Sequence, residues 1–414
     1  MREMKDSGIE WIGSIPKEWK VGKVKDVFIR KNEKAKQENP VVLSLARSGV
    51  KIRDITKGEG QLAENYSNYN PVEKGDFLLN PMDLYSGANC STSEVNGVIS
   101  PAYINLRAKE DNNSKYYDYY FKTQYWAMAL FAHGKGVSFE NRWTLGVDAV
   151  MNYYIPIPKG SVQDKISKFL DKKITEIDNV IEKTKETIED YKLYKQTIIS
   201  KVVTKGINKN CKMKKSGVMW IGNIPEHWKL SKFKYKTDII MGQSPNGNEI
   251  KTEGIIPFMQ GNKEFGTKYP SPTIYCETCN KFCRIGDILM SVRAPVGAIN
   301  EADKVYGIGR GLCSIKVNDE YVKDFVKYYL IKSVNDLKYY SNGSVFEAIT
   351  TEILNNFYLL EIPLTEQRDI VKYLDNRCDE IDDLISNKEK LITELESYKK
   401  SIIYEYVTGK KEVI

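Results

Sequence analysis

The residues that most often carry catalysis are scarce in this sequence. Only two histidines occur, His133 and His227, and neither has a neighbouring cysteine or carboxylate in an arrangement of the triad kind. The histidines therefore give us no reason to predict a catalytic residue.

Three thiols form the strongest candidate for a metal site. Cys276, Cys279 and Cys283 lie within eight residues, a spacing that can ligate zinc or an iron–sulfur cluster. Both sites usually need a fourth ligand; Cys313 is the candidate in this half, and no histidine lies near in sequence. Ordinary reduced thiols in or beside a strand explain the cluster as well, and we predict no metal site.

Other short motifs match catalytic or nucleotide-binding patterns only in part. The glycines from 307 to 311 lack the spacing of a dinucleotide loop, because position 312 is leucine, and a turn that presents Arg310 explains them equally. Residues 80–83 (Asn-Pro-Met-Asp) partly match the catalytic loop of amino-methyltransferases. Residues 249–251 (Glu-Ile-Lys) match half of a nuclease motif. Neither motif is complete, so neither predicts an activity.

Binding chemistry remains, and the polar loops carry the residue types for it. Arginine pairs with guanine and asparagine or glutamine with adenine at base edges, while lysine positions a protein on phosphates. The predicted DNA-binding residues of the first half are Arg47, Ser48, Lys51, Arg53, Lys135, Ser138 and Arg142. Those of the second half are Gln243, Ser244, Gln260, Asn262, Lys263, Arg293, Arg310, Asn342 and Ser344. Each side chain taken singly could be a solvated surface residue, so the prediction depends on the duplication described next.

Two long segments must position these loops. Residues 163–206 and 366–410 align with Asp171 answering Asp375 and Lys195 answering Lys399, each pair 204 residues apart (375 − 171 = 204). Apolar residues recur in both segments in steps of three and four, as at the a and d positions of a heptad. The first stripe is Ile174, Ile177, Ile181, Ile188, Tyr191, Ile198 and Val202, and the second is Cys378, Ile381, Ile385, Ile392, Leu395, Ile402 and Tyr406. The pattern predicts two long helices, the first from 164 to 204, that pack on each other.

A second apolar line lies beside the stripe of the later segment. Leu384, Leu391 and Tyr398 recur every seven residues. A two-stranded coil does not need this line, so we predict it as a docking face for another subunit.

The duplication covers the whole chain. Residues 7–20 (SGIEWIGSIPKEWK) answer residues 216–229 (SGVMWIGNIPEHWK), with Trp19 matching Trp228 at a separation of 209 residues (228 − 19 = 209). The order is therefore a globular part and a long helix, twice. We interpret the tryptophans as buried structural residues, with an aromatic platform for bases as the alternative.

Each globular part mixes strands with one helix. Short apolar runs between Gly, Asn and Pro turns predict strands, for example over 77–79 and 288–290, and a helix is expected from Lys115 to Phe131. The fold class predicted is α+β: two pseudo-symmetric globular α/β parts with two long helices. The polar loops of the two parts differ, which suggests two sites of one type that read different things.

Composition sets the outer limits. The chain has 414 residues, 41% of them hydrophobic, and a net charge of +7 that permits a polyanionic partner. No stretch approaches the ~18 apolar residues of a membrane span, and the N-terminal residues lack the apolar core of a secretory signal. Seven scattered cysteines fit reduced thiols, so a cytoplasmic location is expected.

With these motifs in place, the chain resembles the DNA specificity subunits of type I restriction–modification systems. The resemblance rests on residues at matching places in both halves. These are Trp11-Ile12-Gly13, Ile15-Pro16 and Trp19; Trp220-Ile221-Gly222, Ile224-Pro225 and Trp228; Gly75-Asp76 and Gly286-Asp287; Ile157-Pro158 and Ile362-Pro363; Leu170-Asp171 and Leu374-Asp375; and Glu366-Gln367. One departure occurs, since Val162-Gln163 stands where the second half has Glu366-Gln367.

The resemblance implies two target-recognition domains joined by two long antiparallel coiled-coil helices. Its domains would be residues 1–160 and 207–363, with the helices at 161–206 and 364–414. Each domain would read one half of a bipartite site in double-stranded DNA, and the helices would set the gap. The subunit would itself be no enzyme. It would join two methyltransferase subunits and motor–nuclease subunits, which would carry the methyl donor, Mg and ATP, so no cofactor is expected on this chain.

Two other functions stay open on sequence alone. One is a single-chain methyltransferase or nuclease that uses residues 80–83 or the cysteine cluster. The other is a coiled-coil scaffold whose globular parts bind protein, and whose affinity for DNA would depend on salt but not on sequence.

Overall fold

The structure, a computed structural model, describes residues 2–36, 40–55, 66–82, 84, 89–138, 143–245, 249–341 and 348–413. The chain divides into two compact units: unit 1 is Met1–Thr184 with Glu389–Ile414, and unit 2 is Lys185–Lys388. Each unit therefore combines one globular part with a segment of both long helices. The domain borders expected at 160, 206 and 363 lie at the ends of the long helices, whereas the units divide within those helices. The expected borders remain a prediction.

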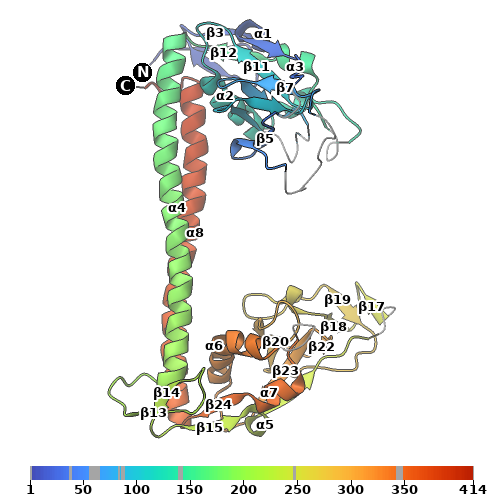
Figure 1. The fold of residues 1–414 in the computed structure, drawn as a ribbon, viewed down its shortest axis with the longest axis vertical. Helices are drawn as coiled ribbons and strands as arrows, with labels where there is room; N and C mark the ends of the chain where they lie inside the picture. Colours follow the sequence, from blue (N-terminus) through green and yellow to red (C-terminus); the bar gives the residue numbers. More distant parts are fainter. Residues whose placement is uncertain are drawn as a thin grey trace. The chain divides into compact units, whose positions relative to one another are not determined.

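The two long helices form where the heptad pattern predicts them. α4 runs over Gly160–Lys205 and α8 over Leu364–Val407 (Figure 1). Every member of the two apolar stripes is buried or half-buried, which confirms the stripes as packed seams. Each helix is followed by a glycine with positive φ, Gly206 (+72°) and Gly409 (+71°), because the left-handed turn that ends a helix suits a residue without a Cβ.

Two equivalent ion pairs show that the helices run antiparallel. In unit 2, Lys195 Nζ lies 2.6 Å from a carboxylate oxygen of Asp382. In unit 1, Lys399 Nζ lies 2.6 Å from Asp178. Lys399 is the repeat mate of Lys195, and Asp382 is the repeat mate of Asp178. Both pairs are 204 residues apart (399 − 195 = 204; 382 − 178 = 204). The lysines that interrupt the seam therefore reach across it to a carboxylate.

The main sheet of unit 1 has four antiparallel strands in the order β4-β11-β8-β9. They are β4 Phe28–Lys31, β11 Ile104–Ala108, β8 Phe77–Leu79 and β9 Cys90–Thr92. The helices are α1 Val24–Val27, α2 Ser114–Trp126, η1 Phe131–His133 and α3 Val147–Met151. Paired strands are β1 Met4–Asp6 with β2 Ser14–Pro16, β3 Lys20–Lys23 with β12 Tyr154–Ile157, β5 Leu43–Ala46 with β6 Gly49–Ile52, and β7 Asn70–Val72 with β10 Gly97–Ile99. The helix expected from Lys115 is thus α2, and it ends five residues earlier than predicted (131 − 126 = 5).

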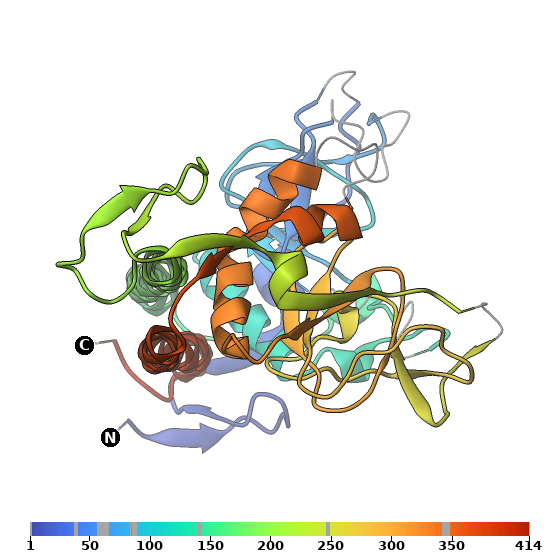
Figure 2. The same ribbon diagram turned by 90° about the horizontal axis from the view of Figure 1, so that it is seen from below.

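Unit 2 repeats this plan. Its main antiparallel sheet has the order β16-β23-β20-β21: β16 Thr237–Met241, β23 Leu312–Val317, β20 Ile288–Ser291 and β21 Ile299–Glu301. A second sheet has the order β17-β19-β18-β22: β17 Ile250–Lys251, β19 Ile274–Cys276, β18 Ile256–Met259 and β22 Gly307–Ile308. The remaining elements are β13 Met213–Lys215, β14 Asn223–Pro225, β15 Lys229–Lys232, β24 Tyr358–Glu361, α5 Phe233–Lys236, η3 Asn262–Glu264, α6 Lys323–Ser341 and α7 Thr351–Asn356. Seen along the helices, the β13–β14 hairpin and α6 lie on different sides of the helix pair (Figure 2).

Each core is closed by both long helices. In unit 1, Ile166 and Leu170 of α4 join Ile402, Ile403 and Val407 of α8 in one buried cluster with the globular part. Unit 1 thus uses the start of α4 and the end of α8, and unit 2 uses the end of α4 and the start of α8. The buried residues there are Ile199, Val202 and Val203 of α4 and Ile370, Val371, Leu374 and Cys378 of α8. The apolar faces of the helices are thus the walls on which both globular parts fold.

Matching hydrogen bonds fix each globular part to the start of a long helix. The buried Gln163 accepts the Asn113 amide at 2.8 Å and donates to the Pro158 carbonyl at 2.8 Å. Its mate Gln367 accepts the Val322 amide at 2.8 Å and donates to the Ile362 carbonyl at 2.8 Å. A buried amide side chain that satisfies two backbone groups is costly to replace, so the duplication preserves backbone contacts as well as sequence.

The two tryptophans that follow Ile-Pro are buried, as predicted. Trp19 is 1% exposed and Trp228 is fully buried, so neither can stack on a base. Each lies under the glycine that ends a long helix, Trp228 against Gly206 and Trp19 against Gly409. The described part of the chain contains no helix long and apolar enough to cross a membrane.

Candidate nucleic-acid interface

Five predicted DNA-binding residues of unit 2 converge on one open cavity. Its volume is about 410 Å³, and its lining includes Gln260, Asn262, Lys263, Arg293 and Arg310. These residues come from three segments separated by about 30 and about 17 residues in the sequence (293 − 263 = 30; 310 − 293 = 17). The fold therefore gathers an amide-rich and arginine-rich surface, which is the chemistry that reads base edges and contacts phosphates.

The glycine run is what brings two of these segments together. Gly309 N donates to the Met259 carbonyl at 2.7 Å, and Gly311 N donates to the Gln260 carbonyl at 3.2 Å. A Cβ on Gly311 would lie 2.6 Å from that same carbonyl oxygen, so only glycine permits this approach. The glycines thus allow a turn that places Arg310 near Gln260. This agrees with the turn that the sequence indicated as the alternative to a dinucleotide loop.

Ser244 ties the cavity to the end of β16. Its hydroxyl oxygen accepts from Gln260 Nε2 at 2.6 Å and from the Arg310 amide at 3.4 Å. Gln260 Oε1 is buried and has no hydrogen-bond partner among the described residues. The Gln260 amide is therefore held against Ser244, and it must turn outward before it can pair with an adenine through both of its polar atoms. The neighbouring Gln243 is exposed, and its backbone N–H donates to the Ile308 carbonyl at 2.9 Å.

Arg293 is held by a short bridge to the segment after α6. It forms an isolated antiparallel bridge with Ala348, and the Ile349 amide donates to the Val292 carbonyl at 2.9 Å. Asn342 and Ser344 precede this bridge in the sequence and lie outside the described residues, as does Arg142 of unit 1. Sequence reasoning missed Glu264, an acidic residue that belongs to the same lining.

The predicted residues of unit 1 lie on two separate loops. Arg47 and Ser48 form the exposed tip of the β5–β6 hairpin, and Lys51 and Arg53 follow on the same strand and its extension. Leu43 and Leu45 anchor the hairpin in a small buried cluster with Val72, Leu78 and Ile99. Lys135 and Ser138 are exposed on the segment after η1, where Lys135 pairs with Thr144.

The three cysteines of the cluster lie at and after the end of β19, with Cys276 as the last residue of that strand. Cys276 and Cys283 are buried and Cys279 is half-buried. Burial and the neighbouring Cys276 raise the pKa of Cys279 to about 12, and burial raises the pKa of Cys283 to about 11. Among the described residues, no group of three or more Cys, His, Asp or Glu side chains could hold a metal ion. The partial nuclease match resolves into an ion pair between Lys251 and Glu277, and Asp83 of the other partial match lies outside the described residues.

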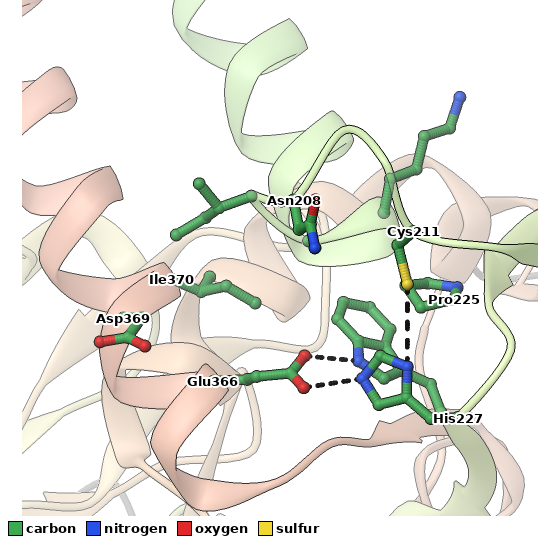
Figure 3. A pocket seen from close by; sticks show the side chains of 11 residues that line it. Asn208, Cys211, Pro225, His227, Glu366, Asp369 and Ile370 are labelled. Carbon is green, nitrogen blue, oxygen red and sulfur yellow. Dashed lines mark hydrogen bonds and ion pairs between the residues drawn. The ribbon is translucent and has the colours of Figure 1, made fainter.

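One sequence-based expectation is wrong. His227 does have a cysteine and a carboxylate beside it: Cys211 Sγ lies 3.8 Å from His227 Nδ1, and Glu366 Oε1 lies 2.7 Å from His227 Nε2 (Figure 3). The partners were hidden because Cys211 precedes His227 by 16 residues and Glu366 follows it by 139. Cys211 and Glu366 form no sequence motif with His227. The cluster forms only when the segments that flank the β13–β14 hairpin pack against the start of α8.

Comparison with known proteins identifies the family. The model of the type I restriction modification DNA specificity domain matches residues 225–397. The chain is 33% identical to the MjaX specificity subunit assigned to a type I restriction enzyme of Methanocaldococcus jannaschii, covering 97% of this chain and 96% of that protein. It is 25% identical to the MjaVIII specificity subunit of the same organism, covering 83% of this chain and 80% of the relative.

Solved structures share the fold. A chain from a study of complex assembly and conformational transition of the type I R-M system superposes with a TM-score of 0.76, at 24% identity, over 96% of this chain and 99% of that one. The HsdS subunit from Thermoanaerobacter tengcongensis superposes with a TM-score of 0.57, at 23% identity, over 96% and 98%. The duplicated frame, the helix pair and the relative that matches across nearly its whole length lead to one conclusion. This chain belongs to the specificity subunits of type I restriction enzymes, the non-catalytic components that recognise the DNA target.

Proposed function

We propose that each globular part reads one half of a bipartite DNA target. The observation that carries the proposal is the convergence of Gln260, Asn262, Lys263, Arg293 and Arg310 on one open cavity of unit 2. Arginine and amide side chains gathered in one place match the donor and acceptor patterns of the major groove. In unit 1 the β5–β6 hairpin would do the reading, with Arg47 and Lys51 as its exposed basic residues.

The second part of the proposal concerns the helices. Because α4 and α8 both run through both units, the number of helical residues between the globular parts would set the gap between the half-sites. Removing one heptad from each helix should change the tolerated gap and leave both half-sites unchanged. A changed half-site with an unchanged gap would refute this ruler.

The helices also offer two equivalent faces for partner subunits. Leu384 and Tyr398 of α8 are 44% and 54% exposed, with Leu391 half-buried between them, and their repeat mates Val180 and Tyr194 of α4 are 46% and 57% exposed. Exposed apolar side chains in a line at this spacing favour a protein partner. Two such faces, one per helix, suit two methyltransferase subunits, and motor–nuclease subunits would join the same complex. We place the methyl donor, Mg and ATP on those partners and the complex in the cytoplasm with its DNA.

Mapping methylated bases in cells that carry this chain and a companion methyltransferase tests the proposal. We expect methylation at a split, asymmetric motif. Replacing residues 230–360 with the corresponding part of another specificity subunit should change one half of the motif only. Methylation at a short continuous motif would refute separate reading by the two parts. The absence of methylation, with the methyltransferase shown active beside another specificity subunit, would favour the scaffold function instead.

A further inference from the structure

A second cavity in unit 2, separate from the one lined by Arg293 and Arg310, is lined by a cysteine, a histidine and a glutamate that the proposed function does not use. Its volume is about 510 Å³, and it lies between the end of α4, the β13–β14 hairpin and the first turn of α8. Three lining residues, Cys211, His227 and Glu366, form a connected series of side chains (Figure 3). We infer that Cys211 is a modification site, a thiol prepared by His227 and Glu366 for exchange with low-molecular-weight disulfides.

Glu366 orients the imidazole. One carboxylate oxygen lies 2.7 Å from His227 Nε2, and the other accepts from Trp228 Nε1 at 2.8 Å. A carboxylate only accepts hydrogen bonds, so Nε2 carries the hydrogen and Nδ1 keeps its lone pair. That lone pair faces Cys211 Sγ at 3.8 Å. The order thiol, base and orienting carboxylate is the arrangement that activates a nucleophile.

Access favours Cys211 over the other thiols. Cys90, Cys276, Cys283, Cys313 and Cys378 are buried, whereas Cys211 and Cys279 are half-buried. Cys279 has its pKa raised to about 12, so little of its reactive thiolate forms near neutral pH. The imidazole beside Cys211 is 46% exposed, so a reagent can reach the pair, and the cavity is large enough for a small organic molecule.

Unit 1 shows that the fold does not require this cluster. At the matching positions, 209 residues earlier (211 − 2 = 209), Arg2 stands for Cys211 and Glu18 for His227, and these two form an ion pair. Val162 stands for Glu366. Trp19 is nevertheless buried as fully as Trp228. The buried tryptophan therefore does not depend on a cysteine or a histidine, and the cluster of unit 2 adds chemistry to a frame that is stable without it.

The exchange step balances without a further reagent. The Cys211 thiol gives its proton to His227 Nδ1, and Sγ attacks one sulfur of the disulfide. The S–S bond of the reagent breaks, a mixed disulfide forms on Cys211, and the other half leaves as a thiolate that takes up a proton. The Cys211 sulfur is oxidised and the departing sulfur is reduced.

The test measures how fast each cysteine of the full chain reacts with excess 2-hydroxyethyl disulfide, by mass spectrometry of quenched peptides between pH 5 and pH 9. We expect Cys211 to react about tenfold faster than any other cysteine at pH 7. His227 can take up the proton of Cys211, whereas a thiol without such a base is only a few per cent ionised at this pH. Cys211→Ser should remove the fast reaction, and the matched control Cys279→Ser should leave it unchanged. The other charged groups that line the cavity, Lys205 and Asp369, stay in place in every variant.

Variants of the base separate activation from mere exposure. His227→Asn should slow the reaction of Cys211 about tenfold at pH 7 and shift its rate–pH profile toward that of an unassisted thiol. His227→Glu, which introduces the residue found in unit 1, should slow it further, because a carboxylate repels the thiolate. Hydrogen exchange in the first turn of α8 checks that these variants keep the fold. The inference is wrong if another cysteine reacts first, or if His227→Asn leaves rate and pH profile unchanged while α8 stays protected.

Discussion

Units 1 and 2 share a frame and differ in what they attach to it. Gln163 and Gln367 make the same backbone hydrogen bonds. The tryptophans, in contrast, are held differently. Trp228 Nε1 donates to Glu366, whereas Trp19 Nε1 is buried without a hydrogen-bond partner among the described residues. The glutamine that bonds to the backbone at the start of each long helix is therefore the same in both units. The residue directly before it differs, Val162 in unit 1 and Glu366 in unit 2.

The loops differ more than the tryptophans. Unit 2 gathers five of its nine predicted DNA-binding residues around one cavity, and the described ones of unit 1 lie on a hairpin and a separate segment. Surface loops can therefore differ between the units while the four-stranded sheets beneath them keep the same plan. Four experiments test how far the two units differ.

The largest effect is expected at the cavity of unit 2. Replacing both Arg293 and Arg310 with alanine should weaken binding to the complete target about 100-fold or more, because each arginine–guanine pair contributes roughly 1–3 kcal/mol. Discrimination at the half-site read by unit 2 should be lost, and discrimination at the other half-site should persist. Competition binding of the assembled complex to targets altered in one half-site measures both. Arg284→Ala, an exposed arginine of unit 2 outside the cavity lining, is the matched control. Equal loss at both half-sites would contradict separate reading.

A smaller effect of equal size in both units is expected at the helix entries. Gln163→Ala and Gln367→Ala each leave a partly buried amide and a buried carbonyl unpaired, which should cost roughly 3 kcal/mol of local stability. Hydrogen exchange should show faster opening near residues 112–117 in the first variant and near residues 321–326 in the second. A cost in one unit only would mean that the shared hydrogen bonds do not support the two globular parts equally.

The tryptophan contrast should give an asymmetric result. Both Trp228→Phe and Trp19→Phe leave a cavity beside the smaller ring, and that cost should be similar in the two units. Trp228→Phe also removes the donor to Glu366, so it should destabilise unit 2 by about 2 kcal/mol more than Trp19→Phe destabilises unit 1, since hydrogen bonds to charged groups contribute roughly 1.5–3 kcal/mol and Trp19 Nε1 has no partner among the described residues. Denaturant unfolding of the full chain, with hydrogen exchange to assign the unit, measures the difference. Equal losses in both variants would show that ring volume alone determines the stability.

The smallest effect concerns acid. Lys31 and Arg107 lower the pKa of Glu73 from its ordinary value of 4.5 to about 2. A carboxylate with a lowered pKa stabilises the folded state above pH 4.5, and that contribution is lost as the pH falls toward 2. In unit 2, Asp287, the mate of neighbouring Asp76, is held by the Ser314 hydroxyl and the Arg284 amide. Glu73→Gln should therefore reduce the acid sensitivity of hydrogen exchange in β4, β8 and β11 and leave β16, β20 and β23 unaffected.

Periodicity was sufficient to predict the long helices, because a stripe of apolar residues at a/d spacing states which face is buried. The duplication likewise predicted two similar α+β parts. Gln260, Arg293 and Arg310 line one cavity, and their role in DNA binding stays a prediction. The Cys211–His227–Glu366 cluster was not predictable, since its members come from a hairpin and a helix more than a hundred residues apart. Side-chain clusters made by long-range packing leave no spacing in the sequence to find.

Both long helices contribute residues to both cores, and this affects the order in which the two units can fold during synthesis. Unit 2 is one continuous stretch, Lys185–Lys388, so all of its residues have been made when Lys388 is added to the chain. Unit 1 still lacks Ile402, Ile403 and Val407 at that moment, and these residues close its core. Domains usually fold in the order in which they are made. Here the part that is translated first must wait, with its apolar face open, and the later part is the first to be completed.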